Sequence, residues 1–247
     1  MKLLLLAHDL VGEEVLTFLL RAHASDLALV VTMEDNTLFQ RAKAAGVPVS
    51  LWKSSRALCD ELTAANLRVD LGLLAWWPAI IKAQLIRSAR AGFINFHPSF
   101  LPFNRGKHYN FWALVEGAPF GVSLHCVDEG VDSGDIIVQR EIPYDWTDTG
   151  ETLYFKAQKE IVRLFCESYP MLRSLQIPRR RQELEKGSFH LAAELTEASR
   201  IDLGRLYRGR ELLNLLRART FKGHPACWFE ESGKRYEVRV EIKRIEE

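Results

Sequence analysis

The sequence predicts an α/β fold in which a doubly wound, mostly parallel sheet is followed by a small α+β module. Short apolar runs alternate with amphipathic segments through the first half of the chain. Continuous apolar strands separated by helices indicate a parallel sheet covered on both faces. The roughly 48 residues after Ser199 are too few for a second independent core, so we expect them to pack on the main domain.

The expected elements follow one another as such a fold requires. In the first half we expect strands at 3–7, 27–32, 47–51 and 71–75, a helix opened by Gly12, and helices at 36–45 and 55–66. Pro98 then ends a strand that contains Asn95 and His97, because proline has no N–H for the ladder. In the second half we expect strands at 122–127 and 136–142, a long amphipathic helix at 152–175, a helix at 206–219, and strands at 226–230 and 236–245. Thr149 or Thr152 would cap the long helix, and Pro170 would kink it.

The domain organisation is read from the end of the long helix. Pro178 stops that helix, and Arg179–Arg181 begins a polar, charged stretch that is most often a solvated helix end. We therefore predict a main domain at 1–180, a connector at 181–199, and a C-terminal helix and hairpin at 200–247.

Charge and cysteine content exclude several classes of protein. The chain has 33 Lys and Arg against 32 Asp and Glu, so no global field favours nucleic acid or a membrane surface. The four cysteines are far apart and form no C-x-x-C pair, which fits a reduced, cytoplasmic protein. The apolar start stops at His8, too early for a typical signal peptide, and no stretch approaches the roughly 18 apolar residues of a membrane span.

Polar side chains at one strand end form the candidate site. Asn95 and His97 are two residues apart, so they share a face at the carboxyl end of a strand, where open α/β sheets commonly build their sites. Asp132 lies in a loop in which Gly130 and Gly134 allow the turns that present a carboxylate inward. An amide and a protonated imidazole can stabilise an oxyanion, and a carboxylate can fix the imidazole's tautomer. These residue types suit acyl transfer but do not name the acyl group.

The same residues carry a resemblance to a known family. Asn95-Phe-His-Pro-Ser-Phe-Leu-Pro102, with Arg105-Gly106 beyond it and Asp132-Ser-Gly-Asp-Ile-Ile137 further on, resembles the formyltransferases that use 10-formyltetrahydrofolate. The likeness follows residues 1–175 in order of elements and is sharp from Leu71 to Ile137. It implies a formyltransferase-like, Rossmann-type fold and an N-formyltransferase that uses 10-formyltetrahydrofolate as co-substrate and no metal.

The resemblance also implies roles for particular residues. Asn95 would hold the formyl oxygen, His97 would assist proton transfer and steady the oxyanion, and Asp132 would orient His97 and help to take the proton from the amine. The folate pocket would fall on Leu74, Ala75, Trp76, Trp77, Pro78 and Ile80 and on Val127, Asp128 and Gly130. Backbone groups there would read the pterin edge, and the tryptophans fit an apolar wall for a flat ring.

The resemblance favours one class of acceptor. Glycinamide ribonucleotide formyltransferases resemble one another in a Gly-Ser-rich loop after the first strand, where this chain has His8-Asp-Leu-Val-Gly12. Methionyl-tRNA formyltransferases carry a longer, more basic C-terminal barrel. The segments 103–110 and 214–221, followed by Trp228 and Tyr236, look like the loop and small module of sugar-nucleotide N-formyltransferases. We therefore expect a nucleotide-linked amino sugar as acceptor and a role in lipopolysaccharide O-antigen biosynthesis. We expect no nucleic-acid or membrane partner. A homodimer through the apolar C-terminal elements is compatible with the sequence.

The expected acceptor contacts lie in these segments. Arg105 and Lys107 would meet a diphosphate, and Phe221 or Trp228 would stack on a base. The complete set is Ser99, Asn104, Arg105, Gly106, Lys107, Tyr109, Phe221 and Trp228, in which Asn104 or Tyr109 would meet the sugar or nucleotide.

Alternatives stay open for several of these side chains. The spacings of His97, His108 and His125 match no common zinc pattern, and we interpret His125 as a strand residue near the pocket. Phe221 and Trp228 could simply anchor the tail by packing. Asp128, Glu129 and Asp135 compete with Asp132 for the role of the carboxylate. Trp76 and Trp77 could be core residues or oligomer contacts instead of a folate wall.

The residues also leave the reaction open. A hydrolase that releases formate from the same folate would use the same three side chains, with water in place of the amine. A binding module that senses folate or a nucleotide without chemistry would need no more than the pocket.

Overall fold

The structure, a computed structural model, describes residues 1–245 and consists of two compact units. Unit 1 contains residues 1–97, 123–139 and 158–182, and unit 2 contains residues 98–122, 140–157 and those from 183 onward. The segments of the two units therefore alternate along the chain. The predicted division at residues 180 and 199 stays a prediction.

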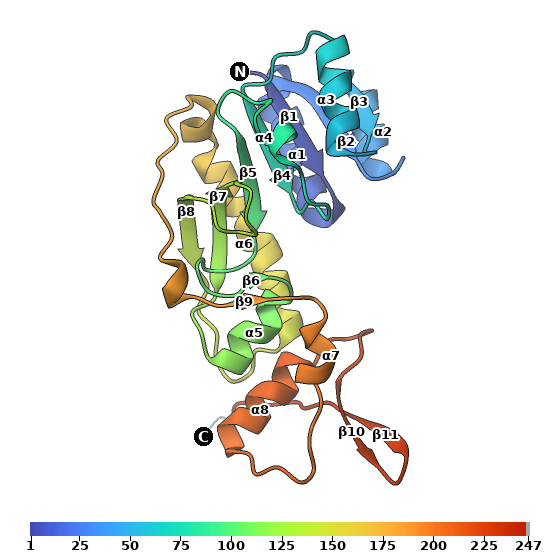
Figure 1. The fold of residues 1–247 in the computed structure, drawn as a ribbon, viewed down its shortest axis with the longest axis vertical. Helices are drawn as coiled ribbons and strands as arrows, with labels where there is room; N and C mark the ends of the chain where they lie inside the picture. Colours follow the sequence, from blue (N-terminus) through green and yellow to red (C-terminus); the bar gives the residue numbers. More distant parts are fainter. Residues whose placement is uncertain (246–247) are drawn as a thin grey trace. The chain divides into compact units, whose positions relative to one another are not determined.

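A seven-stranded sheet forms the centre of the fold, in the strand order β3-β2-β1-β4-β5-β7-β8 (Figure 1). Its strands are β1 (Leu3–Ala7), β2 (Leu27–Thr32), β3 (Val49–Leu51), β4 (Leu71–Ala75), β5 (Phe93–His97), β7 (Gly121–Cys126) and β8 (Ile136–Glu141). The strands from β3 to β5 pair in parallel, and β7 runs antiparallel to β5. Every residue of β1, β2 and β4 is buried, as continuous apolar strands require. The predicted doubly wound, mostly parallel sheet is confirmed.

Helices α1 (Asp9–Ala22), α2 (Thr37–Ala44), α3 (Ser55–Ala64), α4 (Ala83–Ile86) and α6 (Gly150–Arg173) connect or follow these strands. Side-chain caps fix several of their starts. In α6, Thr149 Oγ1 accepts from the Thr152 N–H at 3.3 Å, and Thr152 Oγ1 accepts from the Thr149 N–H at 2.9 Å. This reciprocal arrangement satisfies two backbone donors at once, so both predicted caps are used. The expected kink at Pro170 stays a prediction.

Helix α1 begins before Gly12, where the sequence analysis placed its start. Gly12 lies within the first turn, and a Cβ atom there would lie 3.0 Å from the Cβ atom of Ala7. The glycine therefore serves a close approach between helix and strand rather than a helix end.

Strand β5 presents an apolar side chain to α6. Phe96 is buried, and its ring lies 5.0 Å from the Phe165 ring of α6, measured between centroids. Because side chains alternate along a strand, Asn95 and His97 project from the opposite face of β5. Helix α6 therefore supports the strand that carries the candidate site.

Unit 2 contains short elements that the sequence did not indicate. They include β6 (Arg105–Gly106), which pairs in parallel with β9 (Phe189–His190), and helices α5 (Tyr109–Glu116) and α7 (Glu194–Ala198). Helix α8 (Gly209–Ala218) lies within the range 206–219 where the sequence predicted a helix. Both β9 and α7 lie within the predicted connector, which is thus partly ordered. A two-residue strand that pairs with a segment far away in the sequence leaves no periodic pattern to detect.

The C-terminal hairpin is shorter than expected. Strands β10 (Cys227–Glu231) and β11 (Lys234–Val238) pair antiparallel, and Val238 is opposite Cys227, the first residue of β10. The predicted strand at 236–245 is wrong beyond Val238, because β10 offers no partner there. Among residues 1–245, no helix combines the length and the apolar character that crossing a membrane requires.

One buried carboxylate links α6 to the start of β2. Asp26 is 2% exposed, and its Oδ2 accepts hydrogen bonds from the Tyr169 hydroxyl at 2.8 Å and from Arg173 Nε at 2.7 Å. Burial alone would raise the pKa of Asp26, but the hydrogen bonds from Arg173 and Tyr169 outweigh burial and hold this pKa below its ordinary value.

Replacing Asp26 by Asn should lower the free energy of unfolding by about 1–3 kcal/mol at neutral pH, because the ionised partner of Arg173 is lost. A carboxylate with a lowered folded-state pKa stabilises the protein above its unfolded pKa, and this contribution is lost as pH falls through the folded pKa. In urea unfolding, the difference between wild type and Asp26→Asn should therefore shrink below about pH 4. Asp60→Asn, at an exposed position of α3, is the control. A difference that is the same at neutral and acid pH would contradict this assignment.

Candidate active site

The register of three adjacent strands positions the candidate site. In the parallel pairing of β4 with β5, Asn95 is opposite Leu74, and in the antiparallel pairing with β7 it is opposite His125. His97 is the last residue of β5 and is 4% exposed. An amide and two imidazoles are thus brought to one face of the sheet within unit 1.

Asp132 reaches this face from the loop between β7 and β8. Its Oδ1 accepts a hydrogen bond from Asn95 Nδ2 at 3.2 Å and lies 3.5 Å from His97 Nδ1. The structure therefore brings together the three side chains that the sequence analysis selected. Their catalytic roles stay predictions.

His125 is a fourth member of the group. Its Nδ1 lies 2.8 Å from the Cys126 carbonyl oxygen, which can only accept, so Nδ1 carries the proton. Nε2 of His125 lies 3.1 Å from Asn95 Nδ2 and accepts a hydrogen bond from it in the neutral imidazole. Turning the Asn95 amide around would bring its oxygen against two acceptors, His125 Nε2 and Asp132 Oδ1. The sequence analysis placed His125 near the pocket but did not predict this contact.

The loop around Asp132 is held by its own side chains. Asp128 Oδ1 accepts from the Gly130 N–H at 3.1 Å and from Ser133 Oγ at 2.9 Å. The sequence analysis assigned the turns of this loop to Gly130 and Gly134. The residue with left-handed backbone is instead Asp132, whose φ is 52°. Gly134 is needed for space, because a Cβ atom there would lie 1.9 Å from the Cys126 carbonyl oxygen.

The site also offers potential metal ligands. One ligand atom each of His97, His125 and Asp132 lies within 4.8 Å of the others. Asn95 Nδ2 already donates to two of these atoms, so hydrogen bonding accounts for their arrangement. His108, which the sequence analysis also weighed as a ligand, belongs to unit 2, and burial lowers its pKa. The expectation that no metal is used stays a prediction.

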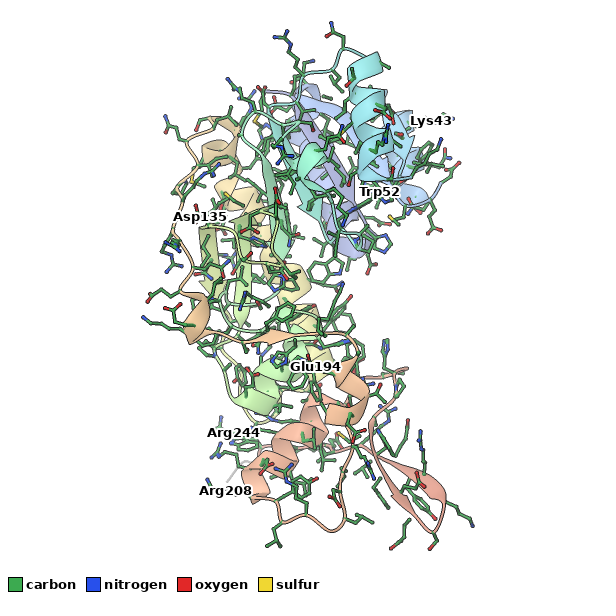
Figure 2. All side chains as sticks on the ribbon, in the orientation of Figure 1. Lys43, Trp52, Asp135, Glu194, Arg208 and Arg244 are labelled. Atoms are coloured by element: carbon green, nitrogen blue, oxygen red, sulfur yellow. The ribbon has the colours of Figure 1, made fainter. Side chains whose placement is uncertain are left out.

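The residues predicted to bind folate line up along the end of β4 and the start of the β7–β8 loop. Leu74 and Ala75 are buried, Trp76 has a φ of 59°, and Ile80 is 74% exposed. Trp77 packs edge-on against Trp52, which is labelled in Figure 2, and belongs with Trp52 to the rim of a hydrophobic core. Trp77 is therefore partly a core residue, one of the two readings left open. Val127 donates its N–H to the Phe93 carbonyl, which places the second segment predicted to bind folate beside β5. Folate binding by these residues stays a prediction.

The first group of predicted acceptor residues lies in unit 2, around β6. Asn104 is buried, and its Nδ2 donates to Glu116 at 2.9 Å and to Ser188 at 3.2 Å. Arg105 lies 5.8 Å from the Phe189 ring centroid. The remaining residues are Ser99, which is buried, Gly106, which approaches the His190 carbonyl, Lys107, which is exposed, and Tyr109, whose pKa burial raises. Its hydrogen bonds give Asn104 a structural role. Acceptor binding by this group stays a prediction.

Phe221 and Trp228, the second group, pack within unit 2. The Phe221 ring contacts the rings of Tyr154 and Phe155, with centroids 5.5 and 6.1 Å away. Trp228 donates from Nε1 to the Thr196 carbonyl and has the guanidinium of Arg235 4.4 Å from its ring centroid. These contacts favour anchoring by packing, the alternative to base stacking.

Comparison with known proteins identifies the family. Residues 1–168 match the family model described as formyl transferase. The chain belongs to the formyl transferase family. The predicted resemblance is confirmed, and residues 194–244 match the N-formyltransferase dimerization C-terminal domain.

Individual relatives cover most of the chain. A dTDP-4-amino-4,6-dideoxyglucose formyltransferase of Mycobacterium tuberculosis is 29% identical over 177 residues, which are 71% of this chain and 74% of that protein. A solved M. tuberculosis structure proposed to be a sugar N-formyltransferase is 26% identical with a TM-score of 0.82 and covers 100% of this chain and 99% of its own. A formyltransferase from Anoxybacillus kamchatkensis, solved with UDP-4,6-dideoxy-4-formamido-L-AltNAc and tetrahydrofolate, is 27% identical with a TM-score of 0.59, over 87% of this chain and 97% of its own.

Replacing Gly134 by Ala should displace the loop that carries Asp132, since the new methyl group would collide with a backbone oxygen of β7. We expect formyl transfer to fall on the order of 100-fold, the cost of misplacing a reactive group by about 1 Å. Gly209→Ala is the control, because no atom lies within 4 Å of a Cβ at that position. Equal turnover of both variants would show that the loop tolerates the methyl group.

Proposed function

We propose that this formyltransferase moves the formyl group of 10-formyltetrahydrofolate to the primary amine of a nucleotide-linked amino sugar. The observation that carries the proposal is the meeting of Asn95, His97 and Asp132 within hydrogen-bonding reach of one another. It is supported by the match of residues 194–244 to the N-formyltransferase C-terminal domain, which accompanies the formyl transferase match.

The three side chains divide the reaction between them. The amine nitrogen attacks the formyl carbon, a new C–N bond forms, and the oxygen of the tetrahedral intermediate carries the negative charge. Asn95 Nδ2 and the protonated imidazole of His97 donate hydrogen bonds to that oxygen. Asp132 orients His97 and accepts the proton that the amine loses. When the bond to N10 of the folate breaks, that nitrogen takes up the proton and leaves as tetrahydrofolate.

Binding must rearrange the amide of Asn95. Its two N–H bonds now point to His125 Nε2 and Asp132 Oδ1. An amide nitrogen has two hydrogens, so one of them must leave its present acceptor before it can serve a formyl oxygen. Catalytic hydrogen bonds that form only in the complex are common in ligand-free structures.

The amino-sugar acceptor is the finer part of the proposal. It is supported by the dTDP-amino-sugar formyltransferase of M. tuberculosis, whose alignment covers 74% of that protein, and by the structural match over the whole chain. The folate is supported by the A. kamchatkensis structure, which holds tetrahydrofolate together with a UDP-linked formamido sugar. Acceptor contacts by the predicted residues of unit 2, a role in O-antigen biosynthesis and the absence of a metal remain parts of this proposal.

We also propose that the protein forms a homodimer in the cytoplasm. In unit 2, Leu203, Leu206 and Leu213 are exposed, and Leu206 is 97% exposed. Exposed leucines offer apolar surface that a second copy can cover, and this module matches a dimerization domain. All four cysteines are free thiols, which fits a reducing compartment.

Replacing Asn95 or His97 by Ala should lower turnover on the order of 10²–10³, because each removes a donor to the oxyanion. The assay supplies the folate and a panel of dTDP-, UDP- and GDP-linked amino sugars and detects the mass gain of one formyl group. Calorimetry with tetrahydrofolate checks that each variant still binds. Absence of a mass gain on every acceptor would count against the transferase, and formate release at the full rate would instead favour the hydrolase.

Replacing Leu206 by Glu should shift the protein from dimer to monomer in sedimentation equilibrium, because a charge would then face the apolar interface. Leu10→Glu is the matched control, since Leu10 is an exposed leucine of α1 in unit 1. A wild-type protein that sediments as a monomer would refute the dimer.

A further inference from the structure

Gln182 contacts the loop that presents Asp132. It lies beyond α6, in the segment where the sequence predicted only a charged connector, and is 6% exposed. Its Nε2 donates to the Asp132 carbonyl oxygen at 2.9 Å and to the Gly134 carbonyl oxygen at 2.6 Å. One side-chain amide thus supplies donors to the backbone on both sides of Ser133.

The segment before Gln182 is fixed to β8. Ile136 donates its N–H to the Arg180 carbonyl at 2.8 Å, and Arg180 donates its N–H to the Ile136 carbonyl at 2.9 Å. The Arg180 guanidinium also donates to Gln139 Oε1. This two-bond backbone bridge to the first residue of β8 sets the position from which Gln182 reaches the loop.

The loop requires such a partner. Asp132 adopts a left-handed φ of 52°, a conformation that costs free energy in a residue other than glycine and that surrounding contacts can offset. Buried carbonyl groups also need donors, and the carbonyl groups of Asp132 and Gly134 find theirs in Gln182. Gln182 Oε1 is buried and accepts no hydrogen bond within residues 1–245, so the side chain is oriented by its donor end alone.

We propose that Gln182 is a positioning residue for the reaction, and that it acts by fixing the backbone conformation that places the Asp132 carboxylate beside Asn95 and His97. The proposal rests on the proposed function. Gln182 belongs to the same compact unit as all three side chains, but its hydrogen bonds go to the backbone carbonyl groups of Asp132 and Gly134 and not to the reactive side-chain atoms. Its influence on the reaction must therefore pass through Asp132.

The first test is Gln182→Met, which keeps the length of the side chain and removes both donors. We expect kcat to fall on the order of 10–100-fold with a KM for the folate within about threefold of wild type, because the pocket remains and the carboxylate moves. Gln182→Glu keeps the shape of the side chain, and its kcat should fall at least as far, because its carboxylate would face two carbonyl oxygens. This variant replaces Gln182→Met in the test if the Met variant does not fold. Gln40→Met is the matched control, because it removes the donor of a glutamine on α2 that bonds to Asp35 and not to the 132–134 loop.

A double-mutant cycle separates positioning from general support of the fold. If Gln182 acts through Asp132, the loss caused by Gln182→Met should shrink to less than about twofold in an Asp132→Ala background. A full loss in that background would overturn the proposal, as would a Gln182→Met enzyme that turns over at the wild-type rate.

A readout without turnover keeps this inference apart from the proposed function. Nitrogen NMR shifts of the His97 imidazole should move, in the Gln182→Met protein, toward those of the Asp132→Ala protein. Should no amino sugar accept the formyl group, the function would fail while this comparison still decides the role of Gln182. His97 signals that match wild type in the Gln182→Met protein would overturn it.

Discussion

One carboxylate oxygen organises the candidate active site. Asp132 Oδ1 lies within 3.2–3.6 Å of an amide nitrogen and two imidazole nitrogens that come from two different strands. His97 and His125 are buried, so their contacts with this oxygen are stronger than they would be at the surface. The strands supply rigid positions for Asn95, His97 and His125, and only the carboxylate comes from a loop. The precision of the site therefore depends on how firmly that loop is held.

The sheet and the loop meet this demand in different ways. Hydrogen-bond register fixes Asn95 opposite His125, and the burial of Phe96 against α6 prevents β5 from turning over. The loop instead relies on polar contacts: Asp128 closes it from within, and Gly134 lets it pass close to β7. Packing alone could not hold a segment so poor in apolar side chains.

Much of this arrangement could be predicted from the sequence. Apolar runs predicted every strand of the parallel region, and the two-residue spacing of Asn95 and His97 predicted their common face. The position of Asp132 followed from a family pattern, because nothing local distinguishes it from Asp128 or Asp135. Asn95 and His125 are 30 residues apart in the sequence and meet because β5 and β7 pair in an antiparallel register. No local sequence pattern reveals that register. Strands β6 and β9 were not predicted for the same reason, because short segments that pair across a long sequence separation have no periodicity of their own.

The alternation of the two units along the chain has a consequence for how such proteins can diversify. Three stretches, 98–122, 140–157 and the part after 182, build unit 2, and the stretches between them build unit 1. A single genetic crossover between two relatives cannot exchange one unit by itself, because no single junction separates all of unit 1 from all of unit 2. Exchanging either unit by itself takes junctions at all five borders, after residues 97, 122, 139, 157 and 182, so recombination between relatives tends to carry the two units together.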